Sequence, residues 1–305
     1  MELRHLRYFL AVAEELNFTR AARRVGIGQP PLSNQIRDLE NEIGASLFRR
    51  LPSGAELTEA GKAFLPEVRA VLLQAEHAKH SALRAAQGHH GRLRVGFTSS
   101  AVFNPIVPAA INVFREKYAA VEFSLEEAPT ARLLERLDAA ELDAVFVRPG
   151  RDDPTQARSQ LLAEEPMVIA VPSGHPKAQA QALRLDELAE ESFVLFPREA
   201  GAGFFDGIIA ACRRAGFDPI LGQPAPQITS IASLIAVGLG ISIVPAEMTK
   251  INVPGVRYIA IAGDSPKARL ALSTRRDERS PVVRNFVAQA ISVQRSLARK
   301  GQLRE

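Results

Sequence analysis

The most informative segment of the chain is residues 17–40, NFTRAARRVGIGQPPLSNQIRDLE. Its first half carries an apolar face at the helical spacing i, i+3, i+4 and i+7, formed by Phe18, Ala21, Ala22 and Val25. Gly26 ends this pattern, and a second helix starts at two prolines, which cost little where the first N–H groups lack intrahelical partners. The apolar side of the second helix is formed by Leu32, Ile36, Leu39 and Ile43. The segment therefore predicts two short helices separated by a glycine turn.

The opposite side of the second helix carries short or forked hydrogen-bonding groups. We expect Ser33, Asn34 and Arg37 to project away from the packed face, with Gln29 and Pro30 at the tip. Such groups fit base edges and phosphates, which makes this helix a candidate for reading DNA. Taken alone, the same pattern is typical of a solvated face on an ordinary helical hairpin, so the neighbouring elements decide between the two interpretations.

The elements around these two helices favour DNA binding. Residues 3–13 predict an amphipathic first helix that completes a three-helix core. Residues 47–50 and 56–58 are strand-like and joined by turn residues, which predicts a hairpin. A hairpin beside a recognition helix is a wing whose arginines can reach phosphate or the minor groove, although adjacent arginines on a lone hairpin are usually a solvated edge. The expected DNA-contacting residues are Thr19, Gln29, Pro30, Pro31, Ser33, Asn34, Arg37, Arg49 and Arg50.

Residues 59–87 form a long helical pattern with Thr58 as its N-cap and Pro66 as a kink or local start. Its apolar residues recur at mixed spacings of three and four: Phe64, Val68, Val71, Leu72, Ala75, Ala78, Ala82 and Leu83. Such a seam is too long and too apolar for a lone linker in water, so we expect it to pair with the same helix of a second copy. Residues 88–91, GHHG, end the helix and act as a joint.

From residue 92 onward, strands alternate with helices. We expect strands at residues 93–97, 121–125, 144–147, 167–171, 193–196, 225–228, 241–244 and 270–273, and helices at 105–118, 130–140, 204–215, 230–237 and 281–297. This alternation predicts a parallel α/β fold whose last segments return to the first set, giving two lobes with a ligand cleft between them. The expected domains are a winged DNA-binding domain (1–58), a linker helix with its hinge (59–91) and an α/β effector-binding domain (92–305), divided into lobe I (92–162 and 267–305) and lobe II (163–266).

Hydroxyl residues stand near three predicted helix starts: residues 98–100, Thr130 and Thr229. Helix N-termini at strand ends offer unpaired N–H groups to ligands, so these positions together predict a carboxylate cradle, although each alone is usually a plain N-cap. Arg148 can add a positive charge, and phenylalanines can supply an apolar wall, although we expect most of them in the core. The expected effector-binding residues are Thr98, Ser99, Ser100, Thr130, Phe146, Arg148, Phe196, Phe204, Ile228 and Thr229.

The composition is that of a globular protein with more than one domain. The length of 305 residues exceeds what one core usually organises, and 46% hydrophobic with 24% charged residues is ordinary for such chains. No membrane-spanning run and no secretory signal is recognisable, so the cytoplasm is the expected location. The single cysteine, Cys212, excludes an internal disulfide and is expected to be buried packing. A net charge of +4 is too mild to reveal nucleic-acid binding by itself.

Catalytic and metal chemistry have no candidate constellation. The glycine pairs at residues 201–203 and 238–240 lack the spacing of dinucleotide or phosphate loops, and no Gly-x-Ser-x-Gly elbow occurs. The histidines have no cysteine or acidic partner at ligand spacing, so neither a metal nor a cofactor is expected at His77, His80, His89 and His90.

The opening helices, the phrase LTEAG at residues 57–61, the long helix and the two-lobed remainder together resemble the LysR-type transcriptional regulators. The specific positions are Phe9, Phe18, Thr19, Ala21, Ala22, Gln29, Pro30, Ser33, Ile36, Leu39, Glu40, Leu47, Phe48 and Gly61. The resemblance implies a winged helix-turn-helix, dimers through the long helix and tetramers on double-stranded promoter DNA. It also implies a small-molecule co-inducer in a domain like the periplasmic binding proteins, with RNA polymerase as a further partner.

Two phrases are similar to the branch of the family that controls the breakdown of aromatic compounds: Phe146-Val-Arg-Pro149 and Leu195-Phe-Pro-Arg198. Inducers of that branch include muconate and benzoate. At the matching positions, the resemblance implies an inducer carboxylate near Ser99 and Thr130. Asn34 departs from the many members that have arginine there.

Three classes of function compete for this sequence. A DNA-binding regulator that activates or represses a promoter in response to a carboxylate fits every segment. A solute-binding protein of a transport system fits the two lobes but has no use for a helix-turn-helix. An α/β enzyme lacks a nucleophile, base or metal set.

Overall fold

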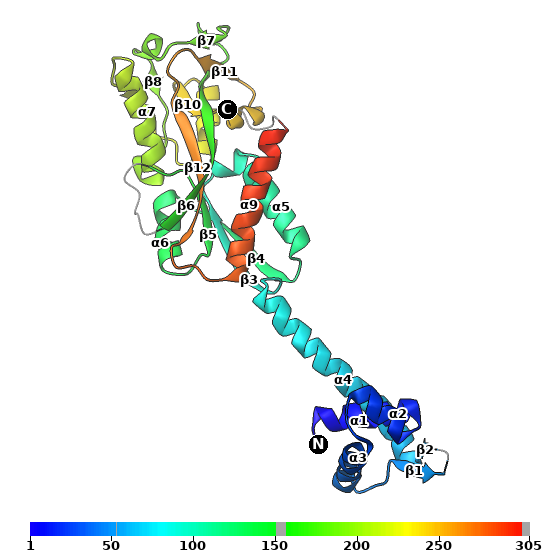
Figure 1. Cartoon of the computed structure of the whole chain (residues 1–305). Coiled ribbons are helices and arrows are strands. Elements are labelled where there is room, and N and C mark those ends of the chain that lie inside the picture. Colours follow the sequence, from blue (N-terminus) through cyan, green and yellow to red (C-terminus); the bar gives the residue numbers. More distant parts are fainter. Residues whose placement is uncertain (53, 151–156, 301–305) are drawn as a thin grey trace. The chain divides into compact units, whose positions relative to one another are not determined.

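The computed structural model describes residues 1–52, 54–150 and 157–300. The chain divides into two compact units, Met1–Arg84 and Ala85–Glu305, and Figure 1 labels most of their helices and strands. Within the described ranges, every helix is too short or too polar to span a lipid bilayer.

The N-terminal unit contains the three helices and the hairpin that the sequence predicts. Its elements are α1 (Leu3–Glu15), α2 (Phe18–Val25), α3 (Gln29–Ile43), β1 (Phe48–Leu51), β2 (Gly54–Leu57) and most of α4 (Glu59–Ala86). The Asn17 side chain caps α2 by accepting from Thr19 N (2.9 Å) and Arg20 N (3.0 Å). Gly26 ends α2 at φ +74°, where a residue without a Cβ is unstrained.

The core of this unit is aromatic. The Phe9 ring lies 5.2 Å from that of Phe48 and 5.0 Å from that of Phe64, so α1, the wing and α4 share one cluster. Val68 of α4 is buried against the same core (1% exposed), and Leu72 packs beside it. Phe64, Val68 and Leu72 of the apolar seam on α4 are therefore covered by their own chain, whereas Val71 and Leu83 are exposed.

The C-terminal unit is built on a mixed sheet with the strand order β4-β3-β5-β12-β6-β11-β7, in which β10 also pairs with β6. The strands are β3 (Gly91–Phe97), β4 (Val121–Glu127), β5 (Ala144–Val147), β6 (Ala157–Pro172), β7 (Ala182–Leu183), β8 (Ser192–Phe193), β9 (Ile220–Leu221), β10 (Ser242–Pro245), β11 (Val256–Ile261) and β12 (Lys267–Arg275). β3, β4 and β5 are parallel, as expected, but β12 and β6 run antiparallel to their neighbours. The predicted α/β fold is confirmed, but the sheet is mixed and not parallel as expected.

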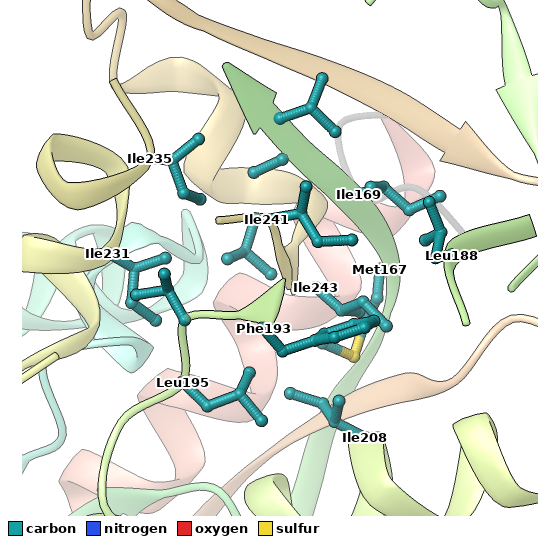
Figure 2. Packing of buried hydrophobic residues seen from close by; sticks show 14 of the residues in the cluster. Met167, Ile169, Leu188, Phe193, Leu195, Ile208, Ile231, Ile235, Ile241 and Ile243 are labelled. Atoms are coloured by element: carbon teal, nitrogen blue, oxygen red, sulfur yellow. The ribbon is translucent and has the colours of Figure 1, made fainter. Parts of the chain in front are cut away.

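The helices of this unit cover the sheet on both lobes. They are α5 (Ile106–Lys117), α6 (Thr130–Asp138), α7 (Ala202–Arg214), α8 (Ile228–Ala236) and α9 (Pro281–Arg299), with the 3-10 turns η1 (Ala101–Phe103), η2 (Leu185–Leu188), η3 (Arg198–Ala200) and η4 (Ala246–Lys250). In lobe I, α5 and α9 pack together through Phe114 and Phe286, whose rings are 5.2 Å apart. In lobe II, Phe193 lies among Met167, Ile208 and other aliphatic side chains, as Figure 2 shows.

Strand β6 connects the two lobes. Its Leu162 belongs to the core of lobe I and its Met167 to the core of lobe II, so the strand expected at residues 167–171 is only the last third of a 16-residue strand. The strand expected at residues 225–228 does not form, because Gln227 is the extended N-cap of α8, which starts at Ile228. In this segment, Ala225 N donates a hydrogen bond to Leu195 O (2.8 Å), as it would in a strand pair.

Candidate DNA-binding surface and effector pocket

Helix α3 presents an exposed polar face. Pro30, Pro31, Asn34 and Arg37 are exposed, and Gln29 at the start of the helix is half-buried. Thr19 is exposed near the start of α2. These six expected DNA-contacting residues are therefore accessible within the N-terminal unit.

Ser33 is different from its neighbours on α3. It is 6% exposed, because it directly follows Leu32 and stands three residues before Ile36, at the border of the apolar stripe. Its hydroxyl accepts a hydrogen bond from Nη2 of Arg50. The prediction that Ser33 projects away from the packed face is wrong.

The two wing arginines have different partners. Arg49 is opposite Glu56 in the hairpin, and its exposed guanidinium pairs with that carboxylate. Arg50 is exposed, but its guanidinium lies over the Phe18 ring, 4.7 Å from the centroid. Glu56 is not among the expected residues of this surface, although the register of the predicted hairpin places it across from Arg49.

In the C-terminal unit, a cavity of about 200 Å³ opens between residues of the two lobes. It is lined by eight of the expected effector-binding residues: Thr98, Ser99, Ser100, Thr130, Arg148, Phe196, Phe204 and Ile228. The remaining lining residues are Glu127, Ala128, Pro129, Ala200, Gly201, Pro226 and Gln227.

Two hydroxyl groups in this cavity are buried and unsatisfied. Thr98 and Thr130 are each 6% exposed, and in the part of the chain that the structure describes neither Oγ1 atom has a hydrogen-bond partner. Thr130 is also the first residue of α6, where the leading N–H groups have no intrahelical acceptor. Buried polar groups are normally paired, so this end of the cavity can take a ligand that accepts hydrogen bonds.

Arg148 lines the cavity but is already neutralised. Its Nη1 donates to Oε1 of Glu165 (2.7 Å), and its Nη2 donates to the backbone oxygen of Ser100 (3.0 Å). Asn104 donates to the same Glu165 oxygen (2.9 Å), and both charged side chains are at most 5% exposed. Arg148 therefore fixes the backbone at Ser100, and its positive charge at the cavity is paired with Glu165.

The apolar side of the cavity comes from lobe II. The rings of Phe196 and Phe204 are stacked, 5.4 Å apart and 9° from parallel. Two expected residues do not line the cavity. Phe146 is fully buried in the lobe I core, because β5 is covered on both faces, and Thr229 lies exposed on α8.

The described residues contain no group of three or more His, Cys, Asp or Glu side chains placed to hold a metal ion. The thiol of Cys212 is buried, and desolvation raises its pKa to about 11. A thiol with such a pKa stays protonated near neutral pH, which is typical of structural cysteines.

A winged helix-turn-helix unit, followed by a two-lobed α/β unit with a ligand-sized cavity, defines a DNA-binding regulator with a substrate-binding domain. The model for the bacterial regulatory helix-turn-helix proteins of the lysR family matches residues 3–62. The model for the LysR substrate binding domain matches residues 86–295. The chain belongs to the LysR family of transcriptional regulators.

Full-length relatives agree with this assignment. The chain is 42% identical over 287 residues to the transcriptional regulator BudR of Raoultella terrigena, covering 94% of this chain and 99% of BudR. It is 35% identical over 283 residues to the regulator CatR of Pseudomonas putida, covering 93% and 96% of the two chains. The crystal structure of full-length CbnR complexed with its target DNA matches with a TM-score of 0.79 at 28% identity, covering 96% of this chain and 100% of CbnR. These relatives are regulators, so the solute-binding and enzyme alternatives are not favoured.

Proposed function

We propose that this LysR-family regulator is switched by a small carboxylate with an aromatic or unsaturated remainder, which binds in the cavity lined by Thr98 and Thr130. The observation that carries the proposal is the pair of buried hydroxyls without partners, beside the N-terminus of α6. A carboxylate taken from water needs several donors to replace its hydration, and two hydroxyls with the N–H groups of a helix start can offer them.

The charge distribution supports binding through dipoles rather than through an ion pair. Because Glu165 compensates Arg148, no free cationic side chain lines the described cavity wall. Glu127, which also lines the cavity, is exposed and adds a negative charge. We therefore infer that the ligand's carboxylate lies at the Thr98 and Thr130 end of the cavity, where solvent screens the exposed charge of Glu127.

The remainder of the ligand is assigned to the stacked phenylalanines. Phe196 and Phe204 give a flat apolar wall suited to a ring or a conjugated chain. The similarity of Leu195-Phe-Pro-Arg198 and Phe146-Val-Arg-Pro149 to the branch controlling aromatic breakdown supports the same choice. BudR matches at higher identity than CatR, so the branch rests on these phrases and on the phenylalanine wall.

The location of the cavity supports a switch. Thr98 and Thr130 belong to lobe I, whereas Phe196, Phe204 and Ile228 belong to lobe II. A ligand that contacts both lobes binds one lobe arrangement more tightly than another and so shifts their populations. A coupling of about 1 to 3 kcal/mol is enough for a several-fold to hundred-fold response.

Calorimetry on the full chain tests the ligand class. We expect benzoate or muconate to bind the wild type, and benzamide, which lacks the negative charge of benzoate, to bind more weakly. The isosteric double variant Thr98→Val/Thr130→Val should lose its affinity for the carboxylate ligand. The matched control is Thr229→Val, which removes an exposed hydroxyl of α8. Equal affinity of the double variant and the wild type would show that the two hydroxyls do not bind the ligand.

The regulator is also proposed to act as a dimer through α4 and as a tetramer on DNA. Val71 (44% exposed) and Leu83 (48% exposed) leave apolar surface on the described part of α4, and pairing with a second copy would cover it. A two-fold dimer would place two recognition helices on a dyad-symmetric site. The solved full-length relatives are consistent with this assembly.

A further inference from the structure

The wing contains adjacent arginines whose surroundings differ completely. Successive side chains of a strand point to opposite faces, so Arg49 and Arg50 leave β1 in opposite directions. The guanidinium of Arg49 pairs with Glu56 across the hairpin, and both side chains are exposed (72% and 39%). Arg50 instead turns toward the helices of the same unit.

Three elements meet at the Arg50 guanidinium. Its central carbon lies 4.7 Å from the centroid of the Phe18 ring, at the start of α2. Its Nη2 donates to Oγ of Ser33, on α3. Phe18 and Ser33 are 9% and 6% exposed, whereas Arg50 itself is exposed. One side of the guanidinium therefore contacts the buried Phe18 and Ser33, and the other side faces solvent. With five N–H donors, the guanidinium can bond Ser33 and still donate to another group.

The backbone that carries Arg50 is held in place from both sides. Oε1 of Glu40, near the end of α3, accepts from Leu47 N (2.7 Å) and Phe48 N (3.0 Å) at the start of the wing. On the second strand, Ala55 N donates to Leu16 O (2.8 Å). A Cβ on Gly54, which has φ +153°, would lie 2.5 Å from that oxygen, so the wing packs directly against the turn after α1. These contacts hold the wing that carries Arg50 against α3 and the end of α1.

We propose that Ser33 is a positioning residue for Arg50 and does not read a base. Together, Ser33 and Phe18 hold the Arg50 guanidinium in an orientation that can bind a DNA phosphate beside α3. A free arginine side chain loses conformational entropy when it binds a phosphate. Because Phe18 and Ser33 already restrict the rotamers of Arg50, less entropy is lost when DNA binds. Because a phosphate carries no sequence information, the contribution of this group is the same for every DNA sequence.

The two roles for Ser33 predict different behaviour. A base reader discriminates between base pairs, so its loss weakens specific binding and leaves non-specific binding unchanged. A positioning residue acts only through Arg50, so its loss weakens binding to every duplex by one factor and has no effect once Arg50 is gone. Phe18→Leu should resemble Ser33→Ala, since it removes the π face under the same guanidinium.

The test is fluorescence anisotropy of the full chain on two duplexes, one from the promoter region of the protein's own gene and one of scrambled sequence, across a series of KCl concentrations. The variants are Ser33→Ala, Arg50→Ala and the double variant, with Asn34→Ala as the exposed neighbour on α3 and thermal unfolding as the check of folding. Arg50→Lys keeps a charge without the planar fork and gives a second reading that does not depend on Ser33.

We expect Ser33→Ala to lower the affinity for both duplexes by the same factor, about two-fold to ten-fold. This factor corresponds to the cost of ordering one long side chain on binding. Arg50→Ala should weaken both duplexes further and reduce the slope of log K against log[salt] by about 0.9, as for one lost phosphate contact. The double variant should match Arg50→Ala, and Arg50→Lys should keep the slope but not the full affinity. Loss of promoter binding alone in Ser33→Ala, or effects of Ser33→Ala and Arg50→Ala that multiply, would overturn the proposal.

Discussion

Nη1 of Arg148 lies 2.7 Å from Oε1 of Glu165, and both side chains are almost completely buried where β6 passes from one lobe core to the other. Asn104 donates to the same carboxylate, and Arg148 also bonds the backbone oxygens of Ser100 and Ala268. The pair therefore joins the ends of β5 and η1 to β6 and β12, directly behind the cavity wall.

Replacing one partner of this pair should be costly. Glu165→Gln keeps the shape of the side chain but leaves the Arg148 charge buried without compensation, so we expect a loss of about 3 to 5 kcal/mol in the free energy of unfolding. Denaturant unfolding followed by circular dichroism measures it. Glu164→Gln is the neighbouring control, because its partner Arg269 is on the surface, and should cost at most about 1 kcal/mol. Equal losses in the two variants would contradict the role given to the buried pair.

The carboxyl of Asp143 should make the free energy of unfolding depend on pH in the acid range. Burial alone would raise the pKa of its carboxyl, but hydrogen bonds from the side chain and backbone of Arg94, with the charges of Arg94 and Arg275, outweigh burial and lower the pKa. The folded pKa is below the unfolded one, so the ionised group stabilises the fold above about pH 4, and that stability is lost as the pH falls through the folded pKa. Between pH 7 and pH 3, the free energy of unfolding should fall less for Asp143→Asn than for the exposed control Asp277→Asn. The same loss in both variants would count against this assignment.

Cys212 should be unreactive in the folded protein. Its pKa of about 11 leaves almost no thiolate at pH 8, and the side chain is fully buried. We expect a disulfide reagent such as dithionitrobenzoate to modify it only after unfolding in guanidinium chloride. Rapid reaction of the native chain at pH 8 would show that the cysteine is accessible and activated.

The helix α4 offers a contrast between a covered and an uncovered apolar position. Val71→Glu with Leu83→Glu changes two exposed residues and should yield folded monomers in light scattering, since like charges would face each other in a dimer. Val68→Glu buries a charge in the core of the N-terminal unit and should instead lower its thermal stability. A folded Val71→Glu/Leu83→Glu variant with an unchanged oligomer would exclude α4 as the dimer contact.

Periodicity was sufficient to predict the helices of the N-terminal unit, because their apolar stripes and glycine ends are local signals. Local signals could not predict the partner of the Ser33 hydroxyl, since Arg50 comes from the wing, 17 residues away in sequence. The same holds for Glu165, whose partner Arg148 is 17 residues before it and whose second donor, Asn104, is 61 residues before it.

The cavity shows what hydroxyl patterns can and cannot indicate. Thr98 follows a predicted strand and Thr130 begins a predicted helix, and both line the cavity as expected. Thr229 satisfies the same local rule but lies outside, because the start of α8 reaches the cavity through Gln227 and Ile228. Phe146 illustrates the limit for apolar residues: a strand covered on both faces buries every side chain, and only tertiary packing decides which phenylalanine faces a ligand.

The central claim is that a carboxylate bound in the effector cavity changes the output of the promoter. The most direct measurement is transcription from the protein's own promoter region in a purified system, with and without the carboxylate that calorimetry identifies, for the wild type, Thr98→Val/Thr130→Val and Thr229→Val. We predict that the wild type and Thr229→Val respond, whereas the double variant does not respond and binds the promoter with unchanged affinity when no ligand is present. A response of the double variant equal to that of the wild type would contradict the claim.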